Sequence, residues 1–118
     1  MMEPDEFEYI AQVNEVPKKQ GLVRIVQEHE IAIFRAEGKF YAVSNVCPHQ
    51  HAPVIAEGIR DGNIITCPMH GWSYDIETGK STNGSGGLTC FDLKIDGDRI
   101  FVKRPLSPPG FSWWNNEI

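Results

Sequence analysis

The sequence has 118 residues, of which 41% are hydrophobic and 23% charged, as is typical of one soluble globular domain. Its formal net charge of -5 disfavours nucleic acid, because the averaged field repels phosphate, and favours a partner with a basic surface. No apolar run approaches the roughly 20 residues of a membrane span, and the acidic amino terminus does not resemble a secretory signal. We therefore expect a cytoplasmic protein without membrane contact.

Short runs rich in β-branched and aromatic residues recur along the chain, and no stretch shows a helical apolar period. In chain order, the expected strands are residues 7–13, 22–26, 30–36, 40–44, 63–66, 71–76, 88–95 and 99–103. Glycine-containing turns at 37–39, 61–63, 77–80 and 96–98 predict antiparallel hairpins. The segment between Asn14 and Gly21 has room for one helical turn, since Pro17 prevents more.

The chain is expected to form one domain over residues 1–104, followed by a tail at 105–118 that is rich in proline and aromatic residues. Proline removes backbone donors, so the tail cannot continue a sheet. The aromatic residues Phe111, Trp113 and Trp114 are costly to leave in water. They are expected either to pack back on the domain or to form a docking or self-association surface.

Two short motifs each combine a cysteine with a nearby histidine. Cys47 and His49 form C-x-H, Cys67 and His70 form C-x-x-H, and seventeen residues lie between the two motifs. A zinc finger usually takes its cysteines from one local unit and its histidines from another. Here the ligand types are interleaved, which suits a two-iron cluster with two thiolates on one iron and two imidazoles on the other. A zinc-stabilised binding module is the alternative.

This doubled motif resembles the ligand signature of the Rieske [2Fe-2S] family. The likeness continues through Pro48, Pro68, Gly71, Tyr74 and Asp75, and the order of hairpins fits the family over most of residues 5–103. The resemblance implies an all-β fold, a Rieske-type antiparallel β-sandwich with a small cluster-binding subdomain of two ligand loops within about residues 46–75. It also implies a Rieske [2Fe-2S] cluster held by Cys47, His49, Cys67 and His70.

High-potential members of the family carry an extra cysteine in each loop, joined as a disulfide, where this chain has Ala52 and Met69. They also have a serine that bonds to sulfur where this chain has Trp72. The loss of that bond and the net negative charge both disfavour an added electron. We therefore expect a potential near the low end of the range from about -150 to +300 mV.

The sequence offers no nucleophile, general base or substrate pocket, so we expect an electron-transfer protein and not an enzyme. The resemblance implies a Rieske-type ferredoxin that passes single electrons from a flavin reductase to an oxygenase or related acceptor. The sequence leaves the oligomeric state open, and a monomer is favoured. The alternative within the family is a small subunit of a larger oxidoreductase, such as assimilatory nitrite reductase.

Two residues do not follow from the motif. His51 occupies a position where the family usually has glycine, and it is interpreted as an exposed loop residue or as a group that tunes the cluster. Cys90 lies in an expected strand, where an unpaired cysteine usually behaves as a small buried hydrophobic residue.

Overall fold

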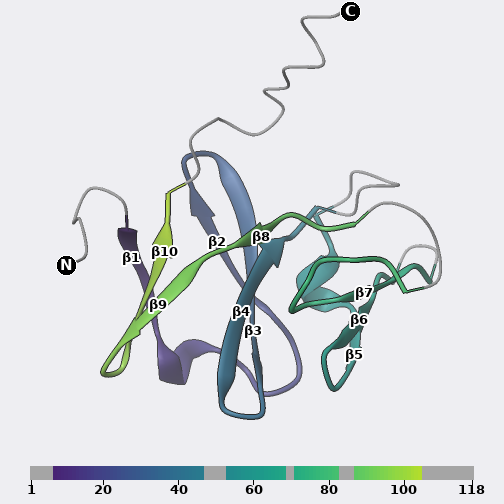
Figure 1. Ribbon diagram of the computed structural model, residues 1–118, viewed down its shortest axis with the longest axis horizontal. Coiled ribbons are helices and arrows are strands. Elements are labelled where there is room, and N and C mark those ends of the chain that lie inside the picture. The colour runs from purple at the N-terminus through teal and green to yellow at the C-terminus, as the bar shows by residue number, and fades with distance from the viewer. Residues whose placement is uncertain (1–6, 47–52, 69–70, 83–86, 105–118) are drawn as a thin grey trace, which may run out of the picture.

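The computed structural model describes residues 7–46, 53–68, 71–82 and 87–104 (Figure 1). The strands are β1 Phe7–Gln12, β2 Leu22–Val26, β3 His29–Ala36, β4 Lys39–Ser44, β5 Ile59–Asp61, β6 Ile64–Thr66, β7 Ser73–Asp75, β8 Cys90–Phe91, β9 Leu93–Asp96 and β10 Arg99–Lys103. Two 3₁₀ turns accompany the strands: η1 Val13–Glu15 lies between β1 and β2, and η2 Ile55–Glu57 lies between β4 and β5. Among the described residues there is no α-helix, and therefore no helix that could cross a membrane.

The strands form three antiparallel sheets, with the orders β1-β10-β9, β2-β3-β4-β8 and β5-β6-β7. The four-stranded sheet lies between the other two in Figure 1. Every strand pair is antiparallel, as the glycine-containing turns predict. The prediction of an all-β antiparallel fold is confirmed.

The central strand β3 is buried on both faces, because side chains of a strand point alternately to opposite sides. Ile31 and Ile33 pack into one core together with Ile100 and other residues of the β1-β10-β9 side. Ala32 and Phe34 pack into a second core. We call this second core the loop-side core; its buried residues are Ala32, Phe34, Ala36, Val43, Ile55, Ala56, Ile65, Cys67, Tyr74, Ile76 and Leu88.

The structure differs from the sequence-based expectation in three places. β5 was not predicted, because its residues Ile-Arg-Asp include one apolar side chain and so show no strand pattern. The expected strand 88–95 divides at Asp92 into β8 and β9, which pair in different sheets. The β2–β3 hairpin turns at Gln27 and Glu28, which adopt φ values of 52° and 70° without glycine.

Candidate metal centre

Of the four predicted ligands, Cys67 is within the described residues, whereas Cys47, His49 and His70 lie outside them. Cys67 directly follows β6, and its side chain is fully buried in the loop-side core. The described residues contain no group of three or more His, Cys, Asp or Glu that could hold a metal ion. Because these residues include one of the four predicted ligands, the ligand set stays a prediction.

The first ligand loop has a stem that is closed by Asn45, the buried polar residue of the described chain, with 2% exposure. Its side-chain oxygen accepts a hydrogen bond from the Ala56 amide at 2.7 Å, and its amide nitrogen donates to the Glu30 carboxylate at 3.2 Å. Its backbone carbonyl accepts from the Ile55 amide at 3.0 Å, and its backbone amide donates to the Glu30 carbonyl. Asn45 thus ties the end of β4 to both β3 and η2.

The second ligand loop begins and ends on a tight hairpin between β6 and β7. The Cys67 amide donates to the Trp72 carbonyl at 2.7 Å, and the Gly71 amide donates to the Cys67 carbonyl at 3.1 Å. Gly71 has a φ of +79°, a conformation that glycine adopts without steric cost. One strand position earlier, the hydroxyls of Thr66 and Ser73 are 2.9 Å apart. The turn conformation explains the glycine.

Both stems are built into the same core. Ile55 and Ala56 of the first stem and Cys67 of the second are buried members of the loop-side core, and Trp72 packs against it. The two loops therefore start from the same core, although they are separate in the sequence. A buried thiol beside two hydrogen-bonded loop stems fits an inorganic centre that takes ligands from both loops.

Cys90 is exposed on β8, the edge strand of its sheet, so the expectation of a buried cysteine is wrong. Its sulfur lies 3.9 Å from the Glu77 carbonyl oxygen. Partial burial of the thiol raises its pKa, and the carboxylates of Asp75 and Asp92 raise it further. A thiol with a raised pKa is protonated and weakly nucleophilic at neutral pH.

The described fold and the two anchored loops define a class: small β proteins that hold an inorganic centre between loops bearing C-x-H and C-x-x-H. The family model of the Rieske [2Fe-2S] domain matches residues 6–91. The chain therefore belongs to the Rieske [2Fe-2S] family. The predicted cofactor, a Rieske-type [2Fe-2S] cluster, is confirmed at the level of the family.

Two relatives of this chain are ferredoxin components of oxygenase systems. The chain is 30% identical over 112 residues to the ferredoxin component of the alkene monooxygenase system of Xanthobacter autotrophicus, covering 92% of each chain. It is 31% identical to the 3-phenylpropionate/cinnamic acid dioxygenase ferredoxin subunit of Escherichia coli K12, covering 86% of this chain and 96% of the relative. The predicted class, a one-electron carrier of the ferredoxin type, agrees with both relatives.

A solved structure shows the same fold. The ferredoxin of carbazole 1,9a-dioxygenase from Nocardioides aromaticivorans IC177 superimposes with a TM-score of 0.79 at 24% identity, covering 85% of this chain and 99% of that chain. The arrangement of three antiparallel sheets is thus that of a Rieske ferredoxin.

Proposed function

We propose that this protein carries single electrons from a flavin-containing reductase to the terminal oxygenase of a multicomponent oxygenase system. The observation that carries the proposal is the match over nearly the whole chain to two ferredoxin components of oxygenase systems. The protein would act in the cytoplasm as a monomer and would itself transform no organic substrate.

The proposed ligands are Cys47 and Cys67 for one iron and His49 and His70 for the other. The ligand spacing in the sequence supports this assignment, and so does the burial of Cys67 next to both loop stems. When bound, the cluster supplies one-electron reduction and oxidation. Neutral imidazoles carry less negative charge than thiolates, which makes the histidine-bound iron the easier one to reduce.

The described residues would hold the stems of the two loops in place and keep water from the Cys67 thiol. Asn45 closes the first loop, and the Cys67–Trp72 hydrogen bond closes the second. A rigid and largely dry setting reduces the reorganisation that accompanies a change in charge. The low-potential assignment remains part of the proposal, since it depends on the missing disulfide cysteines and on the acidic chain.

Protein-film voltammetry tests the proposal. The wild type is expected to give a one-electron wave near the low end of the Rieske range, about -150 mV. His49→Cys or His70→Cys should lower the midpoint potential if a cluster assembles, because an anionic thiolate replaces a neutral ring. An unchanged midpoint in both variants would contradict the ligand assignment.

A mixing experiment tests the role as carrier. The reduced protein, mixed anaerobically with an oxidised Rieske-type oxygenase, should lose its electron at a rate that increases with oxygenase concentration. Stable co-elution with a nitrite reductase large subunit on gel filtration, without electron transfer to any oxygenase, would favour the small-subunit alternative instead.

A further inference from the structure

A hollow of about 400 Å³ lies at the turns that precede β4 and β6. Its lining residues are Lys18, Arg35, Ala36, Glu37, Gly38, Arg60 and Gly62. We call it the basic hollow, because three cations and one carboxylate leave two positive charges in a chain whose formal charge is -5. Its volume is within the range of small-molecule sites.

The two arginines of the basic hollow are held in place by carbonyl groups. Arg35 donates from Nη2 to the Val16 carbonyl at 2.9 Å. Arg60 donates from Nη1 to the Gly62 carbonyl at 2.7 Å and from Nη2 to the Lys18 carbonyl. These bonds orient the guanidinium groups without neutralising them, and a pre-oriented guanidinium is well suited to bind an oxyanion.

The positive charges of the hollow have no anionic partner within the described part of the chain. The ion pairs there join Arg24 to Glu15 and Arg104 to Glu8. In addition, the Nε atoms of both Arg35 and Arg60 are buried without a hydrogen-bond acceptor. Partly desolvated cations without an ion-pair partner are unfavourable, and the Glu37 carboxylate offsets only one of the three charges in the hollow, so an anion bound nearby would stabilise this arrangement.

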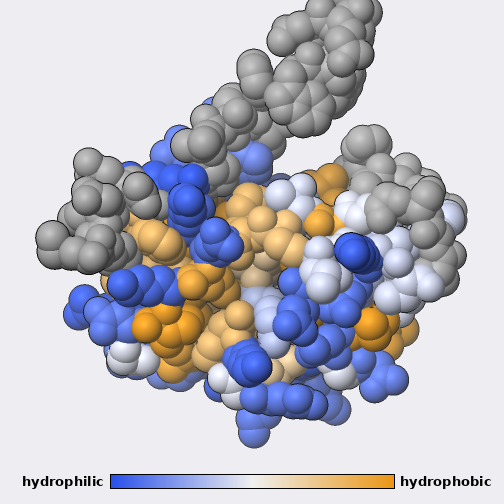
Figure 2. All heavy atoms as spheres, in the orientation of Figure 1, coloured by the Kyte–Doolittle hydropathy of each residue, from blue (hydrophilic) through white to orange (hydrophobic). Residues whose placement is uncertain are grey.

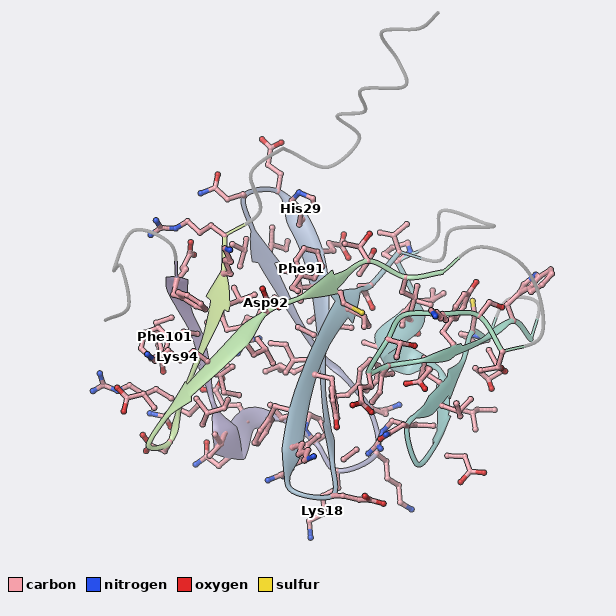
Figure 3. The ribbon with its side chains drawn as sticks, viewed as in Figure 1. Lys18, His29, Phe91, Asp92, Lys94 and Phe101 are labelled. Atoms are coloured by element: carbon pink, nitrogen blue, oxygen red, sulfur yellow. The ribbon has the colours of Figure 1, made fainter. Side chains whose placement is uncertain are left out.

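The basic hollow and the stems of the ligand loops lie at opposite ends of β4 and β6. Gly38 precedes β4 and Gly62 precedes β6, whereas the loop stems at Asn45 and Cys67 follow the same two strands. Figure 3 shows Lys18 at the foot of the β3–β4 hairpin, at the end of the sheet opposite His29. Hydrophilic side chains gather along this lower edge in Figure 2. A ligand bound in the hollow would leave the loop end free for a redox partner.

A second hollow of about 430 Å³ adjoins the first through Arg60. It is lined by Pro17, Lys19, Gln20, Gly58, Ile59 and Arg60. Ile59 is 74% exposed, an unusual exposure for a large apolar side chain, and it borders this space. The basic hollow therefore offers the cations Lys18 and Arg35 on one side of Arg60. The second hollow offers the apolar side chain of Ile59 and the cation Lys19 on the other side.

We propose that the basic hollow binds the phosphate group of a small molecule, with Lys18, Arg35 and Arg60 as its ligands. Two uncompensated positive charges match a phosphate dianion, and the second hollow accommodates the organic part of a phosphate ester. Glu37 opposes binding, and its carboxylate limits the affinity. The site is independent of the proposed electron transfer, since it stands on residues at the other end of the domain.

Titration of the ¹⁵N-labelled holoprotein tests this site by NMR at constant ionic strength. Inorganic phosphate and AMP are each expected to give saturable shifts at Lys18, Gly38 and Gly62, whereas chloride and adenosine give none. If AMP also shifts Gly58 and Ile59 and binds more tightly than phosphate, the ligand is a phosphate ester. Equal affinity with shifts confined to the basic hollow indicates a bare phosphate site.

Variants with matched charge changes complete the test. Lys18→Gln removes an exposed cation and should weaken phosphate binding by up to about fivefold. Arg60→Gln should weaken it about tenfold or more, because a charge-assisted hydrogen bond is lost. Lys94→Gln on β9, far from Lys18 in Figure 3, makes the same charge change and should have no effect.

Linear shifts without saturation, or the same affinity in wild type, Lys18→Gln and Lys94→Gln, would overturn the proposal. Lys18 makes no side-chain hydrogen bond that the fold requires, so its variant remains informative even if Arg60→Gln fails to fold. A normal one-electron wave in a variant that has lost phosphate binding would show that phosphate binding and electron transfer are independent properties.

Discussion

Asn45→Ala should loosen the first ligand loop before it affects the sheets. The substitution removes the acceptor of the Ala56 amide, which is buried and held at 2.7 Å, and the donor to the Glu30 carboxylate at 3.2 Å. A buried amide left without an acceptor costs about 1–3 kcal/mol. The Glu30 carboxylate is only partly buried and can be hydrated, so the loss of its hydrogen bond from Asn45 costs less.

The free energy of unfolding is expected to fall by about 2 kcal/mol in total, which corresponds to an apparent melting temperature lower by about 5–15 °C. The assay follows the visible absorbance of the cluster and the far-UV circular dichroism of the sheets in the same heating experiment. In the variant, the visible absorbance should be lost at a lower temperature than the circular dichroism, because the loop stem opens first.

Asn14→Ala is the matched control, because Asn14 is exposed on η1 and surface substitutions usually change stability by less than about 0.5 kcal/mol. If Asn45→Ala melts at the wild-type temperature, the Ala56 amide finds another acceptor and the reasoning is wrong. If both signals fall together at a lower temperature, Asn45 stabilises the core without any special role in closing the loop.

Three further predictions concern other parts of the chain. The pKa of Cys90 is raised, first by burial and then by neighbouring carboxylates, so its alkylation by iodoacetamide should be slow at neutral pH and rise only above the usual thiol range. Asp92→Asn should move that profile slightly to lower pH, and an unchanged profile would exclude a contribution from the Asp92 carboxylate. Gly79→Ala and Gly38→Ala introduce side chains at nearly equal φ values of 81° and 82°, but only the Gly79 substitution brings a Cβ against a backbone carbonyl. Urea unfolding should therefore show a loss of about 1 kcal/mol for Gly38→Ala and clearly more for Gly79→Ala; equal losses would refute the steric argument. Truncation after Arg104 should leave the visible spectrum intact, and loss of the cluster would show that residues 105–118 shield it.

Strand pattern and turn chemistry were sufficient to predict most of the fold. β3 and β4 are long and apolar, and glycine marks the turn between them, so their pairing follows from local sequence. The β2–β3 turn could not be predicted in this way, because Gln27 and Glu28 adopt positive φ only under the constraint of the paired strands. Likewise, the division of the expected strand 88–95 at Asp92 could not be predicted, because it depends on tertiary pairing: β8 pairs with β4, whereas β9 pairs with β10.

The sequence predicts a ligand set for the candidate site, which stays a prediction, but it does not predict the side chains that support the two loops. Motif spacing and the family resemblance together predict Cys67 as a ligand, and the structure buries its side chain in the same core as Ile55 and Ala56 of the first loop stem. Asn45 was missed, since a single asparagine before a loop carries no pattern of its own. The available signal was its position at the end of an apolar strand, directly before the C-x-H motif. Cys90 was misjudged because its exposure depends on β8 being an edge strand.

Pulsed EPR of the dithionite-reduced protein tests the central claim most directly. Samples with natural-abundance and ¹⁵N-labelled histidine distinguish nitrogen ligands from all other nitrogens near the cluster. Our account predicts couplings from two histidine nitrogens, one of which disappears in His49→Cys and the other in His70→Cys. A reduced cluster without histidine coupling, or native protein that contains no iron, would contradict it.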